Sequence, residues 1–349
     1  MIDLAFPARK KYCSARGWAK LSGLLEVYST RSMHGQYLRF LGQFAFEGKT
    51  MNHYLLEWSR QAVEDLLSMI ELPEPVANNL KSLPEGISHN QTRIMAVANA
   101  TPDSFYPGSR IDAESGALQN MIDASPDIID VGGESTRPGS KGISIEEEIG
   151  RIKPVIDYIV KNSSIDISLD TRHPEVLEEF AGKVSYINDI SAFKNRKMIT
   201  LALDHGLKCI TMHMRGEPGN MQSMTGYTDV LPEVLSFLVH SAENLREAGI
   251  APKDIFIDPG IGFAKDFNGN LELVRDAASF MVGYGTLFGT SRKSFLGKIT
   301  GNETEGRLPA TLATSAYLAA EGIDILRVHD PRENSDVVKV IRKILETGD

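Results

Sequence analysis

The chain has 349 residues, a length that predicts two domains or one large domain with an appendage. Hydrophobic residues make up 42% and charged residues 24%, which excludes intrinsic disorder of the whole chain. The formal net charge of −9 excludes a global positive field that would attract nucleic acid or an anionic membrane, while local basic sites stay open.

Three features of the sequence concern the compartment. Two cysteines, Cys13 and Cys209, are too few for a disulfide scaffold and fit a reducing compartment. No run approaches the roughly 18 apolar residues that a membrane span needs. The first residues place an apolar patch before the positive charges, the reverse of a secretory signal. We therefore expect a cytoplasmic protein.

The first part of the chain, residues 1–90, lacks a regular pattern, and we expect a small α or α+β extension of unknown role. Residues Tyr37–Phe46 predict a strand or a helix, and Tyr54–Ile70 predict an amphipathic helix. A linker is expected from Pro73, Pro75, Pro84 and the polar run Ser88–Gln91.

Residues 91–349 alternate short runs rich in β-branched residues with longer helical stretches, which predicts βαβ units. The predicted strands are Ile94–Asn99, Ile128–Val131, Ile165–Asp170, Tyr186–Ile190, Cys209–His213, Ile255–Asp258, Leu287–Thr290 and Ile325–Val328. Eight such units fit an α/β fold of the (β/α)8 type, the TIM barrel, whose usual length is roughly 250 residues. An open doubly wound sheet is the alternative.

Polar residues gather where these strands end, and in a (β/α)8 barrel that face carries the active site. The residues are Asn99, Asp130, Asp170, Asn188, His213, Asp258, Ser291–Lys293, Arg327 and His329.

Two loops follow the first two strands. Residues Asn99–Arg110 are rich in turn formers, and Phe105 makes this loop either a candidate lid or a surface turn packed on a helix. In Asp130–Ser140, small residues surround Thr136 and Arg137, and the guanidinium of Arg137 suits phosphate oxygens. The glycines there fail the spacings of nucleotide-binding loops, so the anion site depends on the arginine.

Three carboxylates, Asp130, Asp170 and Asp258, end apolar strands together with Asn188. A buried charge must be paired or hydrogen-bonded. A ligand rich in N–H donors would meet this need, and so would internal ion pairs with Lys293 or Arg327.

The last two strands supply cations. Arg292 and Lys293 are adjacent, so on an extended strand only one faces the pocket, and we choose Lys293, with Ser294 beside it. Arg327 and His329 are two residues apart and share a face, so that with Arg137 they can hold a pyrophosphate.

Metal binding has two candidate forms. The spacing of His205, Cys209 and His213 would line one face of a helix, but Gly206 and the β-rich residues after it break that helix, which disfavours zinc. Mg²⁺ bridged by pyrophosphate needs only one or two protein oxygens, so the sequence permits it.

About 255 residues of the chain resemble the dihydropteroate synthases of the pterin-binding family. The resemblance rests on ordered motifs, which are NATPDSF, DVGGESTRPGS, SLDT, INDIS, MHMRGEPGNMQ, DPGIGFAKD, TSRKSFLG and RVHD. It implies a transferase of folate biosynthesis that condenses 6-hydroxymethyl-7,8-dihydropterin pyrophosphate with p-aminobenzoate to give 7,8-dihydropteroate and pyrophosphate. It further implies Mg²⁺ as cofactor, small-molecule substrates, no nucleic-acid or membrane partner, and a homodimer.

The resemblance also implies roles for residues. Asp170, Lys293, Arg327 and Asn99 are the expected catalytic groups, with Asn99 the Mg²⁺ ligand. The pterin pocket would comprise Asp170, Asn188, Asp258 and Lys293, with Asp130 as a neighbour. The pyrophosphate shell would comprise Asn99, Arg137, Arg327 and His329, and the p-aminobenzoate wall Phe105, Thr136, Pro138, Gly262, Phe263 and Ser294.

The sequence departs from the family pattern in two places. The first loop reads DSFYPGSR, which leaves the shape of the p-aminobenzoate side open, while the lack of an insertion next to Phe105 favours sulfonamide sensitivity. Residues 1–90 have no counterpart in the short forms of the family. Two other functions stay open: a methyltransferase on the same barrel, which would not need a pyrophosphate clamp, and a pterin-binding module without activity.

Overall fold

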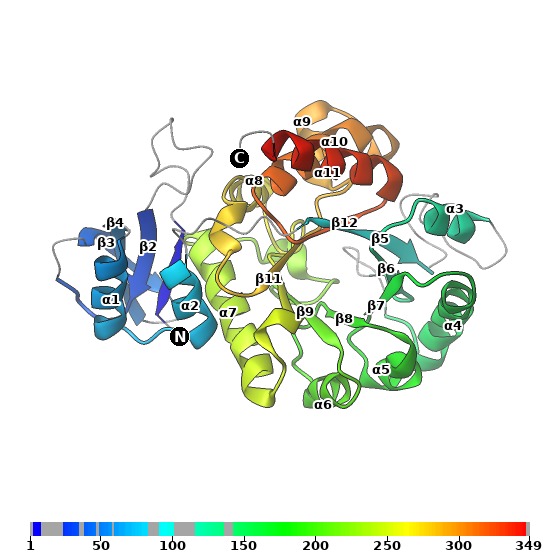
Figure 1. Cartoon of the computed structure of the whole chain (residues 1–349), viewed down its shortest axis with the longest axis horizontal. Coiled ribbons are helices and arrows are strands. Elements are labelled where there is room, and N and C mark those ends of the chain that lie inside the picture. Colours follow the sequence, from blue (N-terminus) through cyan, green and yellow to red (C-terminus); the bar gives the residue numbers. More distant parts are fainter. Residues whose placement is uncertain are drawn as a thin grey trace.

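A closed barrel of parallel strands forms the larger part of the molecule, and a smaller antiparallel sheet lies beside it (Figure 1). This computed structural model describes residues 3–7, 24–34, 38–46, 49–57, 59–82, 91–100, 116–135 and 142–346. Within these ranges no helix has the length and apolar content needed to cross a bilayer.

The barrel strands follow one another around the ring in chain order, each hydrogen-bonded in parallel to the next, and β12 closes the ring against β5. They are β5 Arg93–Asn99, β6 Ile128–Gly132, β7 Asp166–Asp170, β8 Tyr186–Asp189, β9 Lys208–Met212, β10 Ile255–Asp258, β11 Gly285–Phe288 and β12 Ile325–Val328. The predicted (β/α)8 barrel is confirmed, and the alternative of an open sheet is wrong.

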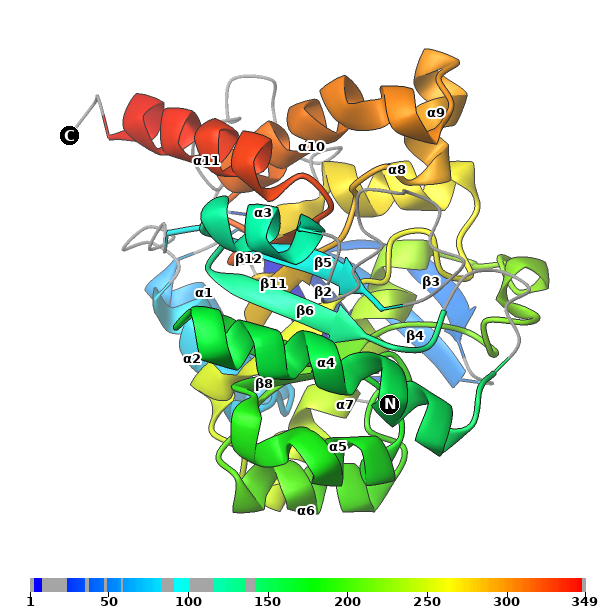
Figure 2. The same ribbon diagram turned by 90° about the vertical axis from the view of Figure 1, so that its right-hand side faces the viewer.

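Helices cover the outside of the barrel, where α4 and α5 lie side by side (Figure 2). They are α3 Ala117–Asp123, α4 Ile145–Asn162, α5 Pro174–Phe180, α6 Arg196–Asp204, α7 Val230–Ala248, α8 Phe267–Arg275, α9 Ser294–Thr300, α10 Leu308–Ala320 and α11 Pro331–Leu345. In α4 the Ser144 side chain accepts a hydrogen bond from the Glu147 N–H and caps the helix. Its buried residues Ile152, Val155 and Ile159 recur at helical spacing and face the core.

The inside of the barrel has an apolar layer followed by a polar one. The buried apolar layer consists of Met95, Ile128, Tyr186, Ile210, Phe256, Leu287 and Ile325. Because side chains alternate along a strand, the residues two positions further on also point inward. In four strands these residues are Asp130, Asn188, Asp258 and Arg327. We call this polar end of the barrel, at the carboxyl ends of the strands, the mouth.

The N-terminal extension is an antiparallel sheet in the order β1-β2-β4-β3 with two helices. Its elements are β1 Leu4–Pro7, β2 Leu24–Ser29, β3 Leu38–Phe46, β4 Lys49–Glu57, α1 Arg60–Met69 and α2 Glu74–Ser82. An α+β extension is confirmed. The predicted helix over Tyr54–Ile70 is wrong in its first turn, because Tyr54 belongs to β4 and pairs with Val27. The predicted linker also holds a helix, α2. The boundary near residue 90 stays a prediction, since residues 83–90 lie outside the described residues.

The extension docks on the segment that leads into the amino end of β11, away from the mouth. The Asn79 side chain donates a hydrogen bond to the carbonyl of Met281 (2.7 Å). Phe6 and Val76 of the extension belong to the same buried apolar cluster as Val282 of the barrel. Gly283, at a φ of +93°, allows the closest approach, since a Cβ there would lie 2.3 Å from the carbonyl oxygen of Pro75.

This contact predicts a difference between two glycine substitutions. Gly283→Ala will lower the free energy of unfolding by more than Gly206→Ala, and deuterium exchange in α2 will increase. Both glycines have positive φ, and this strain alone costs about 1–2 kcal/mol, but a Cβ at Gly206 meets no atom within 4 Å. Urea unfolding and hydrogen-exchange mass spectrometry measure the two effects. Equal losses of stability would show that Pro75 does not constrain position 283.

Candidate functional site

An arginine lies at the centre of the mouth between two carboxylates. Arg327 of β12 donates from Nε to Asp130 Oδ2 (2.6 Å) and from Nη2 to Asp170 Oδ2 (2.8 Å). Asn188 of β8 donates to the same oxygen of Asp130 (3.2 Å). Of the two ways to satisfy the carboxylates that the sequence allowed, the structure contains the internal ion pairs with Arg327. Four of the predicted site residues therefore lie together.

One acceptor in this group has no hydrogen bond from the described part of the chain. Asp130 is fully buried, and its Oδ1 atom lacks a donor there. A buried carboxylate oxygen without a donor is unfavourable, so this atom is suited to accept a further hydrogen bond.

Asp258 and Lys293 lie on the other side of the mouth. The N–H of Gly260 donates to Asp258 Oδ1 (2.7 Å), which fixes the carboxylate at the end of β10. The Nζ of Lys293 lies 4.5 Å from the centre of the Phe263 ring, a cation–π contact. Gly262 has a φ of +86°, and a Cβ there would lie 3.2 Å from Lys293 Cδ. Glycine at this position therefore lets the lysine lie against the loop.

Two buried residues that we did not predict hold this loop in place. Lys265 Nζ donates to the carbonyls of Gly260 (3.0 Å) and Phe263 (2.9 Å) and lies 3.1 Å from Nδ1 of His213. Asn270 Oδ1 accepts from the N–H of Gly262 (2.6 Å). Lys265 lies in the DPGIGFAKD motif. A lysine in such an apolar, glycine-rich segment is the sequence feature that could have indicated a buried, hydrogen-bonded role.

The segment after β11 corrects our argument for choosing Lys293. Because β11 ends at Phe288, Arg292 and Lys293 lie in a turn, and strand alternation does not decide their directions. Arg292 is buried and forms a two-point ion pair with Asp330 (2.8 and 2.7 Å). His329 Nδ1 lies 3.0 Å from the hydroxyl of Ser291. Arg292 therefore has a structural role. The contact of Lys293 with the Phe263 ring, and not strand alternation, supports Lys293 as the residue that faces the pocket.

The other predicted residues have different placements. Asn99 ends β5, is half-buried and pairs in register with Gly132 of the neighbouring strand. Ser294 is exposed in the first turn of α9. Four predicted residues lie outside the described residues, namely Phe105, Thr136, Arg137 and Pro138.

The disfavoured zinc site does not form. Cys209 is buried in β9, His205 is exposed at the end of α6, and the ring of His213 contacts Lys265. Among the described residues these three side chains do not converge on a common metal position.

The charged groups of the mouth shift one another's pKa values. Burial and the neighbouring Asp130 raise the pKa of Asp170 to about 7, even though Arg327 opposes this shift. Burial raises the pKa of Asp258 to about 6, and burial together with the charge of Arg327 lowers the pKa of Lys293 to about 8. For Arg327, burial acts to lower the pKa, but Asp130 and Asp170 outweigh burial and raise it. Acidic and basic groups with shifted pKa values gathered in one place are typical of an active site.

Asp170 makes stability depend on pH. Its pKa is about 7 in the folded chain and about 3.9 in an unfolded one, so the folded chain retains a proton between these values. This contribution to stability therefore falls as the pH rises from about 4 to about 7. We expect Asp170→Asn to remove that fall, while Asp123→Asn, at an exposed carboxyl of α3, leaves it unchanged. Urea unfolding at pH 5 and pH 7.5 measures the free energy of unfolding at each pH. An equal change of this free energy in wild type and Asp170→Asn would contradict the prediction.

Comparisons with known proteins identify the family of the chain. The family described as pterin binding enzyme matches residues 95–329. A dihydropteroate synthase of Bacillus subtilis is 39% identical over 76% of this chain and 93% of its own length. The Escherichia coli enzyme of the same name is 38% identical over 72% of this chain and 91% of its own.

Solved structures give the same result. The Yersinia pestis dihydropteroate synthase in a sulfonamide drug complex superposes with a TM-score of 0.71 at 32% identity, covering 74% of this chain and 96% of that one. The Xanthomonas albilineans enzyme with 4-aminobenzoic acid gives a TM-score of 0.67 at 32% identity, covering 74% and 94%. The chain therefore belongs to the pterin binding enzyme family and, within it, to the dihydropteroate synthases, which are transferases of folate biosynthesis.

Proposed function

We propose that the mouth of the barrel performs the dihydropteroate synthase reaction with the residues described above. The bond between the pterin methylene carbon and the pyrophosphate oxygen breaks, and the pyrophosphate takes the electron pair. The amine nitrogen of p-aminobenzoate forms the new bond to this carbon and then loses a proton to water. The observation that carries the proposal is the hydrogen-bonded group of Asp130, Asp170, Asn188 and Arg327 above an apolar layer.

We assign the pterin to the space between Asp130 and Asn188 on one side of the mouth and Asp258 and Lys293 on the other. Asp130, Asp258 and Asn188 can accept hydrogen bonds from the N–H and amino groups of the ring, and Lys293 can donate to its acceptors. The Oδ1 atom of Asp130 supports this assignment because it is an acceptor that receives no hydrogen bond from the described part of the chain. Asp170 then stabilises the positive charge that develops on the pterin as pyrophosphate departs.

We assign the pyrophosphate to Arg327 and His329, with Arg137 as a further ligand. In the described part of the chain, two of the five N–H groups of Arg327 donate to carboxylates. The remaining N–H groups can bind phosphate oxygens without breaking these ion pairs. Arg327 would then link the two ends of the breaking bond.

Mg²⁺ fits this arrangement through Asn99. The amide oxygen of Asn99 at the carboxyl end of β5 is a hard donor, and Mg²⁺ commonly binds one or two protein oxygens together with phosphates. When bound, the ion would reduce the negative charge of the leaving group.

The p-aminobenzoate is assigned to a wall formed by Gly262, Phe263 and Ser294 with Phe105, Thr136 and Pro138. The complex of the Xanthomonas albilineans relative with 4-aminobenzoic acid supports this substrate. Lys265 donates a hydrogen bond to the backbone carbonyl of Phe263 and so holds this residue in place. The half-buried ring of Phe263 then offers a fixed apolar surface to the aryl ring. A sulfonamide would compete for the same wall.

The resemblance further implies a homodimer in the cytoplasm. Sedimentation velocity of the purified chain would test the dimer.

The reaction predicts pyrophosphate release that needs both substrates. Purified protein given the pterin pyrophosphate, Mg²⁺ and p-aminobenzoate will release pyrophosphate, and omission of p-aminobenzoate will abolish it. At a pH above the pKa of Asp170, which is about 7, Asp170→Asn will lower kcat by about 100-fold or more, because a charge that stabilises the transition state contributes on this scale. If the folded variant kept the wild-type kcat, Asp170 would have no part in the chemistry.

Lys293 is expected to act mainly in pterin binding. Lys293→Ala will weaken binding of the pterin pyrophosphate by about 10-fold or more, since a hydrogen bond to a charged group contributes about 1.5–3 kcal/mol. Lys298→Ala, at an exposed lysine of α9, is the matched control and will bind as wild type. Calorimetric titration measures both, and unaltered affinity in Lys293→Ala would remove this residue from the pocket.

A further inference from the structure

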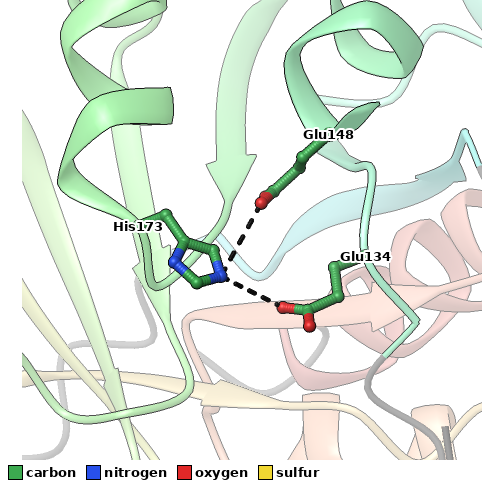
Figure 3. Close-up of side chains that lie close together, drawn as sticks. All are labelled: Glu134, Glu148 and His173. Atoms are coloured by element: carbon green, nitrogen blue, oxygen red, sulfur yellow. Dashed lines mark ion pairs between the residues drawn. The ribbon is translucent and has the colours of Figure 1, made fainter. Parts of the chain in front are cut away.

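Two carboxylates and an imidazole converge beside the mouth at a place that the proposed reaction does not use. Glu134 follows β6, Glu148 lies in the first turn of α4, and His173 precedes α5. Their ligand atoms all lie within 4.8 Å of one another. Figure 3 shows both carboxylates directed at the same edge of the His173 ring.

The separations in this cluster suit metal coordination better than hydrogen bonding. His173 Nε2 lies 3.5 Å from Glu134 Oε2 and 3.9 Å from Glu148 Oε2. Good hydrogen bonds to oxygen are shorter, about 2.7–3.2 Å. Two ligand atoms of a tetrahedral zinc ion, each about 2.1 Å from the metal, are roughly 3.4 Å apart. The two separations from His173 are close to that value.

Glu148 supplies an independent observation. The residue is fully buried, and its Oε2 has no hydrogen bond from the described part of the chain. The other oxygen accepts from the hydroxyl of Thr171 (2.7 Å), which fixes the carboxylate and directs Oε2 into the cluster. Burial also raises the pKa of Glu148, against the Thr171 hydrogen bond. A cation beside Oε2 would satisfy this atom.

The net charge around the cluster is negative and suits a divalent cation. Arg172 contacts both oxygens of Glu134 (3.2 and 3.1 Å) and pairs with Glu217 (2.7 Å). With a neutral His173, the three glutamates and this arginine carry a net charge of minus two. Each oxygen of Glu134 also keeps a second lone pair, because a carboxylate oxygen accepts about two hydrogen bonds.

We propose that Glu134, Glu148 and His173 bind one divalent transition-metal ion, with zinc preferred. An imidazole with two carboxylates is a donor set that zinc accepts, and a water molecule would complete a tetrahedron. The His173 side chain is 27% exposed, which gives the ion a path from solvent. The ion would link Glu134, just after β6, to the first turn of α4 and to the residue that precedes α5. The site shares no residue with the Asn99 position assigned to Mg²⁺.

Calorimetric titration of the chelator-treated full chain with Zn²⁺ tests the proposal. We expect His173→Gln to weaken one bound zinc by about 10-fold or more, a loss at least as large as that caused by removing an outer-shell group. His240→Gln, at an exposed histidine of α7, is the matched control and will bind as wild type. Glu148→Gln gives a second test, with circular dichroism to verify its fold.

Cobalt supplies a readout of geometry. Co²⁺ in a tetrahedral site absorbs visible light strongly, so the wild-type chain will show this band and His173→Gln will lose it. Equal zinc affinity in wild type and His173→Gln, or no binding at all, would overturn the proposal and leave a plain ion-pair cluster. Neither measurement depends on turnover, so the outcome is independent of the reaction proposed above.

Discussion

The pairing of Arg327 with Asp130 and Asp170 is the interaction on which the mouth of the barrel depends. Asp130 and Asp170 end the neighbouring strands β6 and β7, and in a low dielectric the two carboxylates could not remain charged together without a cation. Because Arg327 reaches from β12 to both β6 and β7, it fixes the directions of two carboxylates with one side chain. The rest of the site is arranged around this pair, with Asn188 beside Asp130 and with Asp258 and Lys293 opposite.

Much of the barrel could be predicted from the sequence because the relevant signal is local. A strand alternates with a period of two, so an apolar residue such as Phe256 places Asp258 on the same inward face. The direction of Arg292 could not be predicted in this way, because it depends on Asp330, 38 residues later in the chain. Lys265 was missed for a related reason, since its partners are carbonyl groups whose positions only the folded loop determines.

The extension was harder to predict, because short apolar segments fit both the helical period of 3.6 residues and the strand period of two. Tyr54 lies in a strand since β4 pairs with β2 and β3 on its two sides, a long-range constraint that periodicity does not contain. The prolines before the barrel were read as a linker, yet Pro75 falls in the first turn of α2, where proline is tolerated because its missing N–H has no partner there. The loops that hold Phe105 and Arg137 lie outside the described residues, so their predicted roles stay predictions.

The hydrogen bonds around Lys265, Asn270 and Arg292 have a consequence for ligand design. Those of Lys265 and Asn270 brace the segment after β10, and that of Arg292 joins the segment after β11 to Asp330 after β12, so this half of the mouth is set in shape before any ligand arrives. A receptor that is already ordered loses little conformational entropy on binding, and the same advantage extends to a stiff ligand. Rigid bicyclic inhibitors aimed at Asp258 and Lys293 would therefore convert more of their contacts into affinity than flexible ones of equal size.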